Sequence, residues 1–436
     1  MNVNFAERAH NHNWKLDPIV RSLLDTDFYK LLMLQFIWKN FPRTSVTSEI
    51  CNRTVKVKLA DRISANALHE QMEHVRGLRF LRSELIWLAG NTFYGVMHIF
   101  EPAFLDWLEH GFRLSPYEIS EHNGQLLIRF SGLWTEVTMW EVYALAIVSE
   151  LKTRAALAEL SEMELDVLYA RAKTRLWDKI EKLRRIEGLR LSDFGTRRRH
   201  SFLWQEYAVE ALMASLGDRL IGTSNTALAY KHNLEAIGTN AHELPMVMAA
   251  LASRVSDEAL RESQYKVLEL WQRSYGGELL IMLPDTFGTT QFLQNAPAWT
   301  AHWTGERVDS KDPFEAGEEY ITWLEDRGEN PRSKRLIASD ALDVDDIIRL
   351  HRHFNDRIRF SAGWGTLLTN DFRNCHPRNE HTFEPISLVC KITSADGIPT
   401  VKLSDNPTKS TGPAEEIARY RRVFNSPVLA EQPVLV

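Results

Sequence analysis

The stretch RLIGTSNTALAYKHNLEAIGTNAHE, residues 219–243, holds two short apolar runs that each end in Gly-Thr, at Gly222-Thr223 and at Gly238-Thr239. Helical segments lie between several runs of this kind in the chain, and one of them, residues 243–254, follows the second run. A strand, a polar turn and a helix repeated in this way are typical of parallel βα units. The stretch therefore predicts an α/β fold whose chemistry lies in the loops after the strands.

The same pattern continues on both sides of this stretch. Further apolar runs that end in polar clusters occupy residues 189–193, 279–285, 335–339 and 358–362, with helical segments at 202–216, 243–254 and 345–354. Units in this number are compatible with a βα barrel or with a doubly wound sheet. Both folds collect their functional residues at the carboxyl ends of the strands, so those loops are where we look for a site.

The remainder of the chain does not follow the βα pattern. Residues 23–38 are apolar at helical spacing, with Asp25 and Asp27 in or near the first turn, and residues 60–112, 140–153 and 163–187 are predicted to be helical. Residues 45–51 and 125–130 are predicted strands. Two more strand-like runs, 386–392 and 400–403, flank an Asp-Gly pair, which indicates a hairpin outside the barrel.

Composition excludes several classes of protein. The 436 residues carry a net charge of −6, so no global basic field favours a nucleic-acid partner. Cys51, Cys375 and Cys390 form no CxxC pair and no zinc-site spacing, which indicates a reducing compartment. We expect no secretory signal in residues 1–14 and no apolar run of the roughly 18 residues that a membrane helix needs. A cytoplasmic location is therefore expected.

Arginines follow the first predicted strand of the βα region. Gly195 is followed by Thr196 and then by three arginines, of which Arg197 is the first, at a strand-to-helix turn. Glycine permits close backbone approach, and a helix start with forked guanidinium groups suits a phosphate or carboxylate. The bland alternative is a solvated basic helix start.

Polar residues also follow the other strands. His242 opens a helix after Gly-Thr, Arg307 and Asp309 stand in a seven-residue charged turn, and Gly363-Trp364-Gly365-Thr366 can wrap a phosphate with backbone N–H groups. Each has an ordinary alternative: a helix-capping histidine, a turn before a helix, and a common glycine loop. Asp340 ends another strand, where an N-cap is the alternative.

The order and spacing of these segments identify the chain as similar to a known family. TDFYK (26–30), DFGTRRR (193–199), GTSN (222–225), IGTNAHE (237–243), RVDSKDP (307–313), SD (339–340), GWGT (363–366) and KLSDNPTK (402–409) resemble nicotinate phosphoribosyltransferases across nearly the whole chain. The resemblance implies a type II phosphoribosyltransferase fold: a distorted α/β barrel, placed at residues 156–379, plus an α/β domain from residues 1–155 and 380–436. It also implies a homodimer with shared active sites and a place in NAD biosynthesis from nicotinate.

The resemblance further implies roles for individual residues. Phe194 and Tyr29 are expected to stack on the two faces of the pyridine, with Tyr29 supplied by the partner subunit. Thr239 and Arg307 are expected to contact nicotinate, with Arg197 close by, and Ser224 to line the same pocket. Gly363, Gly365 and Thr366 are expected to hold the 5′-phosphate. His242, Arg307 and Asp309 are the residues expected to take part in catalysis.

ATP and Mg²⁺ are the expected co-substrate and cofactor. His242 resembles the histidine that ATP phosphorylates in this family. Mg²⁺ is expected to enter with the pyrophosphate of phosphoribosyl pyrophosphate rather than on protein ligands, with Asp309 and Asp340 orienting ribose hydroxyls or metal-bound waters. Two departures from the family pattern are Lys311, where we expect glycine, and Pro245, which falls within a first helical turn. A side chain at 311 would crowd the ribose or add a cation near the pyrophosphate.

Other functions are compatible with parts of this pattern. Nicotinamide phosphoribosyltransferase is the main alternative, and position 224 separates the two, because those enzymes carry Asp where this chain has Ser224. Quinolinate phosphoribosyltransferases are shorter and lack the histidine segment. A silent barrel that binds a phosphorylated ligand as a scaffold would be favoured by loss of His242 or of the arginines, and both are present.

Overall fold

Seven parallel strands form a curled sheet in the order β8-β7-β6-β12-β11-β10-β9. The strands are β6 (Leu191–Asp193), β7 (Leu220–Thr223), β8 (Glu235–Ala236), β9 (Ile281–Met282), β10 (Gly305–Val308), β11 (Arg335–Ala338) and β12 (Arg359–Trp364). Because the first strand, β6, pairs with the last, β12, the order is that of a barrel and not of a doubly wound sheet. No ladder joins β8 to β9 in the described part of the chain; there the Asn240 side chain donates to the Ile281 carbonyl at 3.2 Å.

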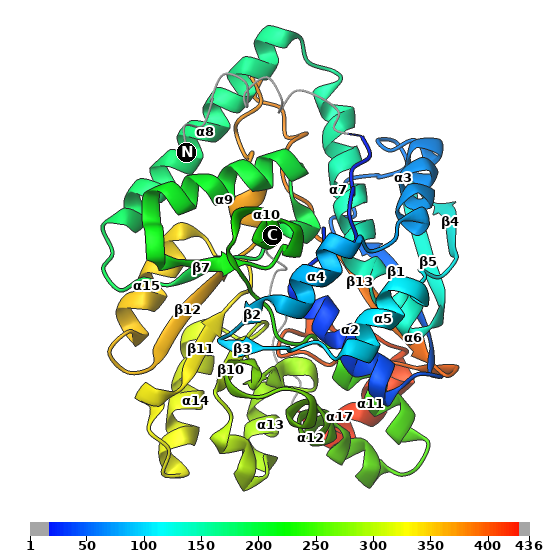
Figure 1. Cartoon of the computed structure of the whole chain (residues 1–436), viewed down its shortest axis with the longest axis vertical. Helices are drawn as coiled ribbons and strands as arrows, with labels where there is room; N and C mark the ends of the chain where they lie inside the picture. Colours follow the sequence, from blue (N-terminus) through cyan, green and yellow to red (C-terminus); the bar gives the residue numbers. More distant parts are fainter. Residues whose placement is uncertain (1–16, 427–436) are drawn as a thin grey trace.

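Helices follow most of the strands and cover the outer side of the curled sheet (Figure 1). They are α9 (Phe202–Leu216), α10 (Thr226–His232), α11 (Glu243–Ser253), α12 (Asp257–Ser274), α13 (Thr289–Asn295), α14 (Pro313–Asp326), α15 (Val344–Phe354) and the single turn α16 (Thr366–Thr369). The capping residues explain several helix starts. Ser201, Asn225 and Asp312 each accept a hydrogen bond from the first turn of the helix that follows. Pro245 lies in the first turn of α11, as predicted.

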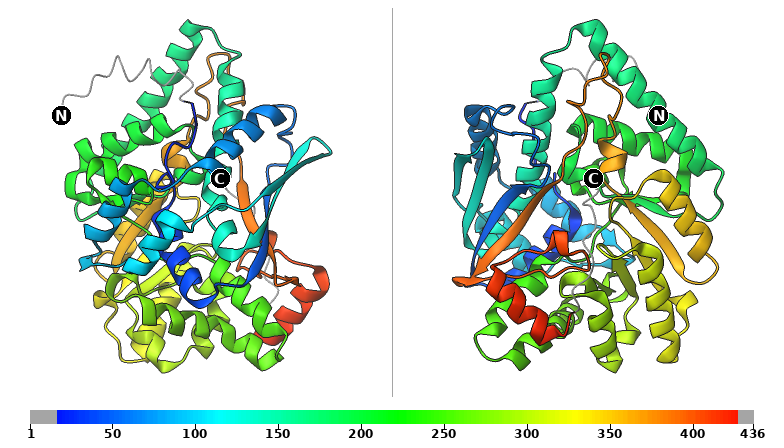
Figure 2. Two further views of the ribbon diagram at one scale, coloured as in Figure 1. Left: turned by 45° about the vertical axis from the view of Figure 1, so that its right-hand side comes forward. Right: turned by 180° about the vertical axis from the view of Figure 1, so that it is seen from behind.

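A second, antiparallel sheet joins the two ends of the chain. Its order is β14 (Ile398–Pro399), β13 (Leu388–Ala395), β1 (Ser45–Asn52), β5 (Gln125–Leu133) and β4 (Tyr117–His122). Seen from behind in Figure 2, β13 (orange) lies beside β1 (blue), with Ile50 opposite Cys390. The predicted hairpin is present: Asp396 and Gly397 both have positive φ at the turn between β13 and β14. Residues 400–403 form no strand, and Lys402 makes only an isolated bridge with Thr411.

The remaining helices pack between and beside the two sheets. They are α2 (Phe28–Asn40), α3 (Ala65–Gly77), α4 (Arg82–Gly90), α5 (Pro102–His110), α6 (Trp134–Val137), α7 (Trp140–Leu157), α8 (Glu162–Arg184) and α17 (Ala414–Phe424). A contiguous buried apolar cluster runs from α2 and α7 into the parallel strands. This shared core holds the antiparallel sheet in a fixed position over the barrel.

Two further local predictions need correction, and strand β10 was not predicted. The helical prediction for 60–112 is wrong in part, because a small hairpin of β2 (Thr92–Phe93) and β3 (Val96–Met97) interrupts it; Tyr94 and Gly95 turn with positive φ. The helix predicted from residue 23 begins at Phe28, since Asp25 and Asp27 bind side chains of the barrel. Strand β10 was missed because Glu306 and Arg307 break its apolar pattern.

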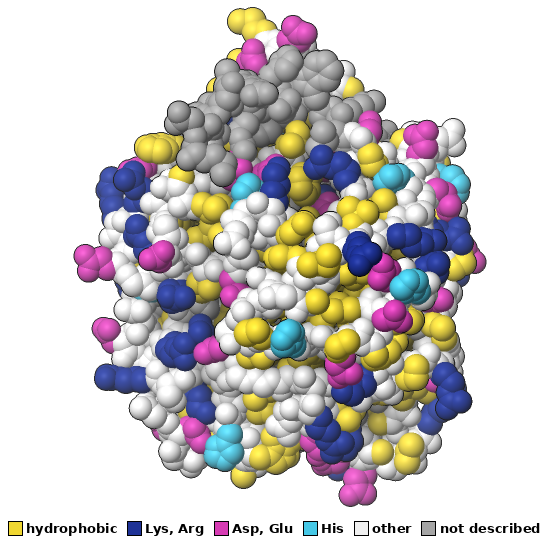
Figure 3. All heavy atoms as spheres, viewed as in Figure 1, with side chains coloured by type: hydrophobic (Ala, Val, Ile, Leu, Met, Phe, Trp, Pro, Cys, Tyr) yellow, Lys and Arg dark blue, Asp and Glu magenta, His cyan; other side chains and the backbone are white. Residues whose placement is uncertain are grey.

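The structure describes residues 17–426, so the start of the chain, where we expected no secretory signal, lies outside the described residues. None of the helices in this part is long and apolar enough to cross a membrane. Cys51, Cys375 and Cys390 are all free thiols. On the face shown in Figure 3, acidic and basic side chains are interspersed. The domain boundaries at 155/156 and 379/380 stay predictions.

Candidate active site

A cavity of about 230 Å³ is enclosed by the loops after the parallel strands and by the antiparallel sheet. Loops that follow β6, β8, β10, β11 and β12 contribute to its wall, and β13 forms the opposite side. Nine of the sequence-predicted site residues line it: Tyr29, Phe194, Arg197, His242, Arg307, Asp309, Asp340, Gly365 and Thr366. The structure thus brings together residues that are up to 337 positions apart (366 − 29).

The loop after β6 positions Phe194. Its backbone N–H donates to the Trp364 carbonyl at 2.8 Å, and the buried Asp193 carboxylate accepts from Gly195 N at 2.8 Å. Burial raises the pKa of Asp193 to about 6, although the Thr223 hydroxyl and other donors bind its carboxylate. Gly363 does not line the cavity; a Cβ there would stand 2.3 Å from the Phe194 ring. Gly363 therefore provides the space that the ring occupies.

The three consecutive arginines have different surroundings. Arg199 is fully buried and forms a two-pronged pair with Asp25 at 2.6 and 2.7 Å, which makes it a structural residue. Arg197 lines the cavity and lies 3.3 Å from Glu141 and 3.5 Å from Asp27. Arg198 also lines the cavity, and its Nε donates to a backbone carbonyl of β13 at 2.9 Å. Only two of the three can therefore face a ligand.

Two further predicted residues, Ser224 and Thr239, are buried outside the cavity lining. The Ser224 hydroxyl donates to Asp27 at 2.7 Å, and Asp27 is the carboxylate that faces Arg197. Ser224 thus supports Arg197 from behind and does not touch the cavity. Local sequence did not show this, because the residue that reaches across to Ser224 comes from the start of α2.

Tyr29 lines the cavity of its own chain, together with Phe194. The expectation that a partner subunit supplies this ring to a shared site stays a prediction. The Tyr29 hydroxyl lies 3.3 Å from Glu141, and both burial and that carboxylate raise the pKa of the phenol. The phenol is consequently neutral, as a stacking ring should be.

A fully buried lysine ties Tyr29 to the histidine loop. Lys30 Nζ pairs with Glu141 at 2.7 Å and with Glu243 at 2.6 Å. Glu243 is the residue next to His242 and opens α11. Breaking such a buried ion pair on one side leaves an uncompensated charge, which typically costs about 3–5 kcal/mol. The pair therefore fixes the position of α2 relative to the His242 loop.

His242 belongs to a charged network that the sequence only partly revealed. Its Nε2 lies 2.6 Å from Asp285 Oδ1 and 3.7 Å from Asp309 Oδ2. Lys402 Nζ lies 3.1 Å from the same Nε2 and 3.3 Å from Asp285 Oδ2. The carboxylate contact favours a proton on Nε2, whereas the Lys402 ammonium at the same nitrogen favours a lone pair there, so the two neighbours compete for Nε2. Burial lowers the pKa of His242, so the ring is neutral near pH 7.

The carboxylates around His242 remain ionised. Burial works to raise the pKa of Asp285, but His242 and Lys402 hold it well below its usual range. Burial also works to raise the pKa of Asp309, but the charges of His242 and Lys402 help to hold that pKa at about 2. Asp340 differs, because burial and the Asp309 carboxylate raise its pKa. Of these three carboxylates, Asp309 and Asp340 line the cavity, whereas Asp285 contacts His242 from outside the lining; Asp340 takes up a proton more readily than the other two.

Lys402 and Lys409 place the KLSDNPTK segment at the site. Lys409 Nζ hydrogen-bonds to Asp340 and lies 3.4 Å from the Asp309 carbonyl oxygen. From the far end of the chain, the two lysines thus reach the barrel loops that follow β8, β9, β10 and β11. The segment was part of the family resemblance, but neither lysine was predicted as a site residue. Asp285 was not predicted either, although it follows strand β9 as the predicted residues follow their strands.

Four cations that line the cavity have no carboxylate within 4.0 Å in the described part of the chain: Arg53, Arg198, Arg307 and Lys391. The Arg307 Nε is buried and has no hydrogen-bond partner among residues 17–426. Lys391 Nζ donates to the Lys409 carbonyl at 3.0 Å. Burial and the nearby Arg53 lower the pKa of Lys391 to about 6. Burial and Arg197 lower that of Arg198 to about 10. Such a cluster is completed by an anionic ligand.

Lys311 is turned away from this site. Its Nζ pairs with Glu319 of α14 at 2.6 Å and with the Thr290 hydroxyl at 3.1 Å. It is not among the residues that line the cavity. Neither expected effect, crowding of the ribose or an added cation near the pyrophosphate, is therefore supported by the position of its side chain.

Comparison with known proteins assigns the chain a family. Residues 189–428 match the model of the nicotinate phosphoribosyltransferase (NAPRTase) family, and residues 24–149 match that of the NAPRTase N-terminal domain. Nicotinate phosphoribosyltransferase from Vibrio cholerae is 31% identical with a TM-score of 0.84, over 95% of this chain and 96% of that one. The Porphyromonas gingivalis enzyme is 29% identical with a TM-score of 0.79, over 93% and 100%. A putative nicotinate phosphoribosyltransferase from Saccharomyces cerevisiae is 27% identical with a TM-score of 0.79, over 94% and 99%.

Proposed function

Because the chain belongs to the nicotinate phosphoribosyltransferase family, we propose that it joins nicotinate to phosphoribosyl pyrophosphate, with ATP as a co-substrate. The products would be nicotinate mononucleotide, pyrophosphate, ADP and phosphate. The observation that carries the proposal is the set of four cavity cations without carboxylate partners, beside the rings of Tyr29 and Phe194. An aromatic acid and a polyphosphorylated sugar together supply a ring for the two aromatic side chains and anions for the four cations.

The pyridine is proposed to lie between Phe194 and Tyr29, with its carboxylate toward Arg307 and Arg197. Stacking of this kind contributes roughly 1 kcal/mol beyond the buried area. A carboxylate that faces guanidinium groups gains charge-assisted hydrogen bonds of about 1.5–3 kcal/mol. A neutral amide cannot match these bonds, which favours nicotinate over nicotinamide. Ser224 would act on this choice through Asp27 and Arg197.

The phosphates are proposed to lie toward the antiparallel sheet. Arg53, Arg198 and Lys391 line the cavity, and Gly365 and Thr366 belong to the same lining. A phosphate there would restore the charge of Lys391, whose pKa burial and Arg53 have lowered. Binding would therefore be coupled to proton uptake by this lysine.

Transfer itself requires no nucleophile from the protein. The pyridine nitrogen forms a bond to ribose C1 while the bond from C1 to the pyrophosphate oxygen breaks, and the pyrophosphate leaves with the electron pair. The chain holds the two reactants in line and stabilises the departing charge. Mg²⁺ on the pyrophosphate would neutralise part of that charge. Asp309 and Asp340 would bind the water molecules on this Mg²⁺, because both carboxylates line the cavity and oxygen ligands suit Mg²⁺.

ATP is proposed to phosphorylate His242 on Nδ1. In this proposal Asp285 accepts a hydrogen bond from the Nε2–H group of His242 at 2.6 Å, and the lone pair of the ring is on Nδ1. That nitrogen would form the bond to the γ-phosphorus as the bond to the ADP oxygen breaks. Asp285 would stabilise the positive charge that the ring acquires, and Lys402 lies 3.3 Å from Asp285 to complete the network.

The test is mononucleotide formation by the purified chain from nicotinate and from nicotinamide, each with and without ATP. We expect product from nicotinate, ATP stimulation, and a KM for nicotinate about 10- to 100-fold higher in Arg307→Ala, from the loss of one charge-assisted contact. Arg419→Ala, which removes a surface pair with Asp257, is the matched control and should change nothing. Equal efficiency with nicotinamide would support the nicotinamide alternative, and no product from either would support a scaffold.

A further inference from the structure

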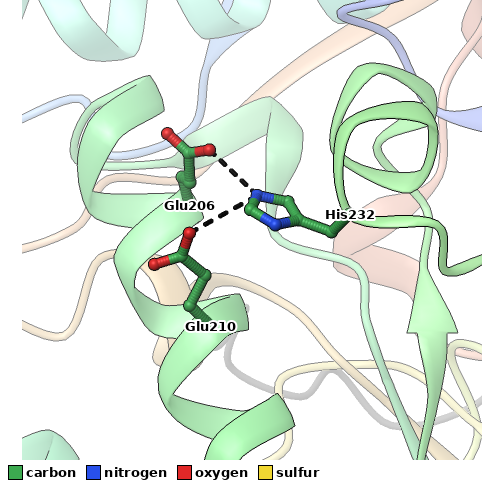
Figure 4. A group of neighbouring side chains, drawn as sticks. All are labelled: Glu206, Glu210 and His232. Atoms are coloured by element: carbon green, nitrogen blue, oxygen red, sulfur yellow. Dashed lines mark hydrogen bonds and ion pairs between the residues drawn. The ribbon is translucent and has the colours of Figure 1, made fainter. Parts of the chain in front are cut away.

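Three side chains of the kinds that bind metal ions lie close together on the outer side of the barrel, away from the cavity. Glu206 and Glu210 stand one turn apart on α9, and His232 is the last residue of α10 (Figure 4). His232 Nε2 lies 2.9 Å from Glu206 Oε1 and 3.7 Å from Glu210 Oε1. The three ligand atoms all lie within 4.8 Å of one another. None of the three residues lines the cavity, so the proposed reaction does not use them.

Glu206 is buried and Glu210 and His232 are partly buried, each on its helix. Their exposed fractions are 5% for Glu206, 12% for Glu210 and 7% for His232. Val209 of α9 and Leu228 of α10 belong to one small apolar cluster, which joins the two helices. Ligands that are fixed in this way lose little rotamer freedom when they bind an ion.

The charges are compatible with a cation at the centre of the group. Among the described residues, the two carboxylates face the imidazole of His232 and the ammonium of Lys231, whose Nζ lies 2.6 Å from Glu206 Oε1. The Lys231 side chain is 59% exposed, so it can move into solvent when another cation takes its place. Buried carboxylates are otherwise costly unless they are paired or bind a metal.

We propose that Glu206, Glu210 and His232 bind a divalent first-row transition cation such as Zn²⁺, which fastens α9 to α10. Imidazole nitrogen together with carboxylate oxygen is a donor set that zinc accepts, whereas Mg²⁺ prefers oxygen alone. Tetrahedral zinc with ligands at about 2.0–2.2 Å separates neighbouring ligand atoms by about 3.4 Å. The observed 2.9 and 3.7 Å lie on either side of that value, so small side-chain adjustments are sufficient. Water would complete the shell.

The competing explanation is a hydrogen-bonded cluster in which a protonated His232 and Lys231 neutralise the two glutamates. The two explanations differ in what Lys231 does. In a metal site the ammonium competes with the ion, so Lys231→Met should tighten binding. In a cluster without an ion the ammonium is a stabilising partner, and its removal should only lower the melting temperature.

The experiment titrates the metal-stripped full chain with Zn²⁺ by calorimetry and follows Co²⁺ by its visible absorption. We expect one zinc ion that is lost, or bound at least about tenfold more weakly, in His232→Ala and in Glu210→Gln, which keeps the size of the side chain. Lys231→Met should bind zinc roughly threefold or more tightly, through the loss of a nearby positive charge. Mg²⁺ in excess should not displace the zinc.

Two controls make the result decisive. His302→Ala removes an exposed histidine that pairs with one glutamate, Glu329, and should leave zinc binding unchanged. His242→Asn alters the other cluster of His and Asp ligands, and the zinc assigned to α9 and α10 should remain. Equal zinc binding in folded His232→Ala, folded Glu210→Gln and the parent chain would overturn the proposal, as would weaker binding in Lys231→Met. Circular dichroism of each variant shows whether it is folded.

Discussion

The substitution Gly363→Ala tests how the ring of Phe194 is seated. A Cβ at position 363 would stand 2.3 Å from ring atoms Cδ2 and Cε2 of Phe194. Carbon atoms pack comfortably at about 3.5–4.0 Å, so the ring must move by roughly 1.2 Å or more. The backbone of Phe194 cannot follow easily, because its N–H is bonded to the Trp364 carbonyl at 2.8 Å. The side chain itself therefore has to take up the displacement.

The displacement should appear in nicotinate binding. Overpacking of this kind costs typically about 1–3 kcal/mol, which corresponds to a roughly 5- to 140-fold increase in the KM for nicotinate if stacking carries the cost. Gly365→Ala is the matched control, because its Cβ would meet only the Phe194 carbonyl oxygen at 3.6 Å, an ordinary contact. If Gly365 lies against a phosphate, the control should instead raise the KM for phosphoribosyl pyrophosphate.

Steady-state kinetics with each substrate varied in turn separates the two effects. Circular dichroism and the melting temperature establish that both variants are folded. A folded Gly363→Ala enzyme with an unchanged KM for nicotinate would refute the assignment of Phe194 to the pyridine. A change confined to phosphoribosyl pyrophosphate would place the ring elsewhere in the cavity.

Three further predictions follow from the charged groups. Incubation with labelled ATP should leave an acid-labile phosphate on the protein. His242→Asn should abolish the labelling, and Asp285→Asn should slow it, since Asp285 hydrogen-bonds to His242 Nε2 at 2.6 Å. Undiminished labelling of the His242 variant would reject that residue as the site of phosphorylation. Lys391→Met should raise the KM for phosphoribosyl pyrophosphate about tenfold or more. Because the pKa of Lys391 is about 6 in the free protein, affinity should fall as pH rises above 6 in the parent enzyme and fall less in the variant; parallel pH profiles would contradict this. Lys311→Gly should change neither KM by more than about twofold, because Lys311 pairs with Glu319 at the surface of α14; a larger effect would show that the side chain reaches the cavity.

Local sequence was sufficient for the βα units and for much of the site. Helix α9 has the bounds that its apolar spacing predicted, and the Asp-Gly pair turns the hairpin where it was expected. Phe194, His242 and Asp340 were found because parallel strands bring their carboxyl ends to one edge, whatever their order. Strand β10 was not predicted, because its sequence GERV contains two charged residues and no apolar run.

The tertiary structure decided which polar residues face the ligand. Ser224 follows Gly-Thr as predicted, yet its hydroxyl is taken by Asp27, a residue 197 positions away. Gly363 was expected at a phosphate and instead seats a ring. In both cases the neighbour comes from a distant segment, so the local pattern cannot specify it.

The sequence by itself determined the elements, the barrel loops that hold the site, and the resemblance that points to the family. Only the tertiary structure placed Arg53 and Lys391 on the cavity wall, and only it closed the cavity with strand β13. Strand and helix follow from the spacing of apolar residues along a few turns of chain. Whether a lysine on a strand faces water or a cavity depends on what packs against that strand, and this is settled by pairing between β1 and β13, whose partners lie more than 300 residues apart.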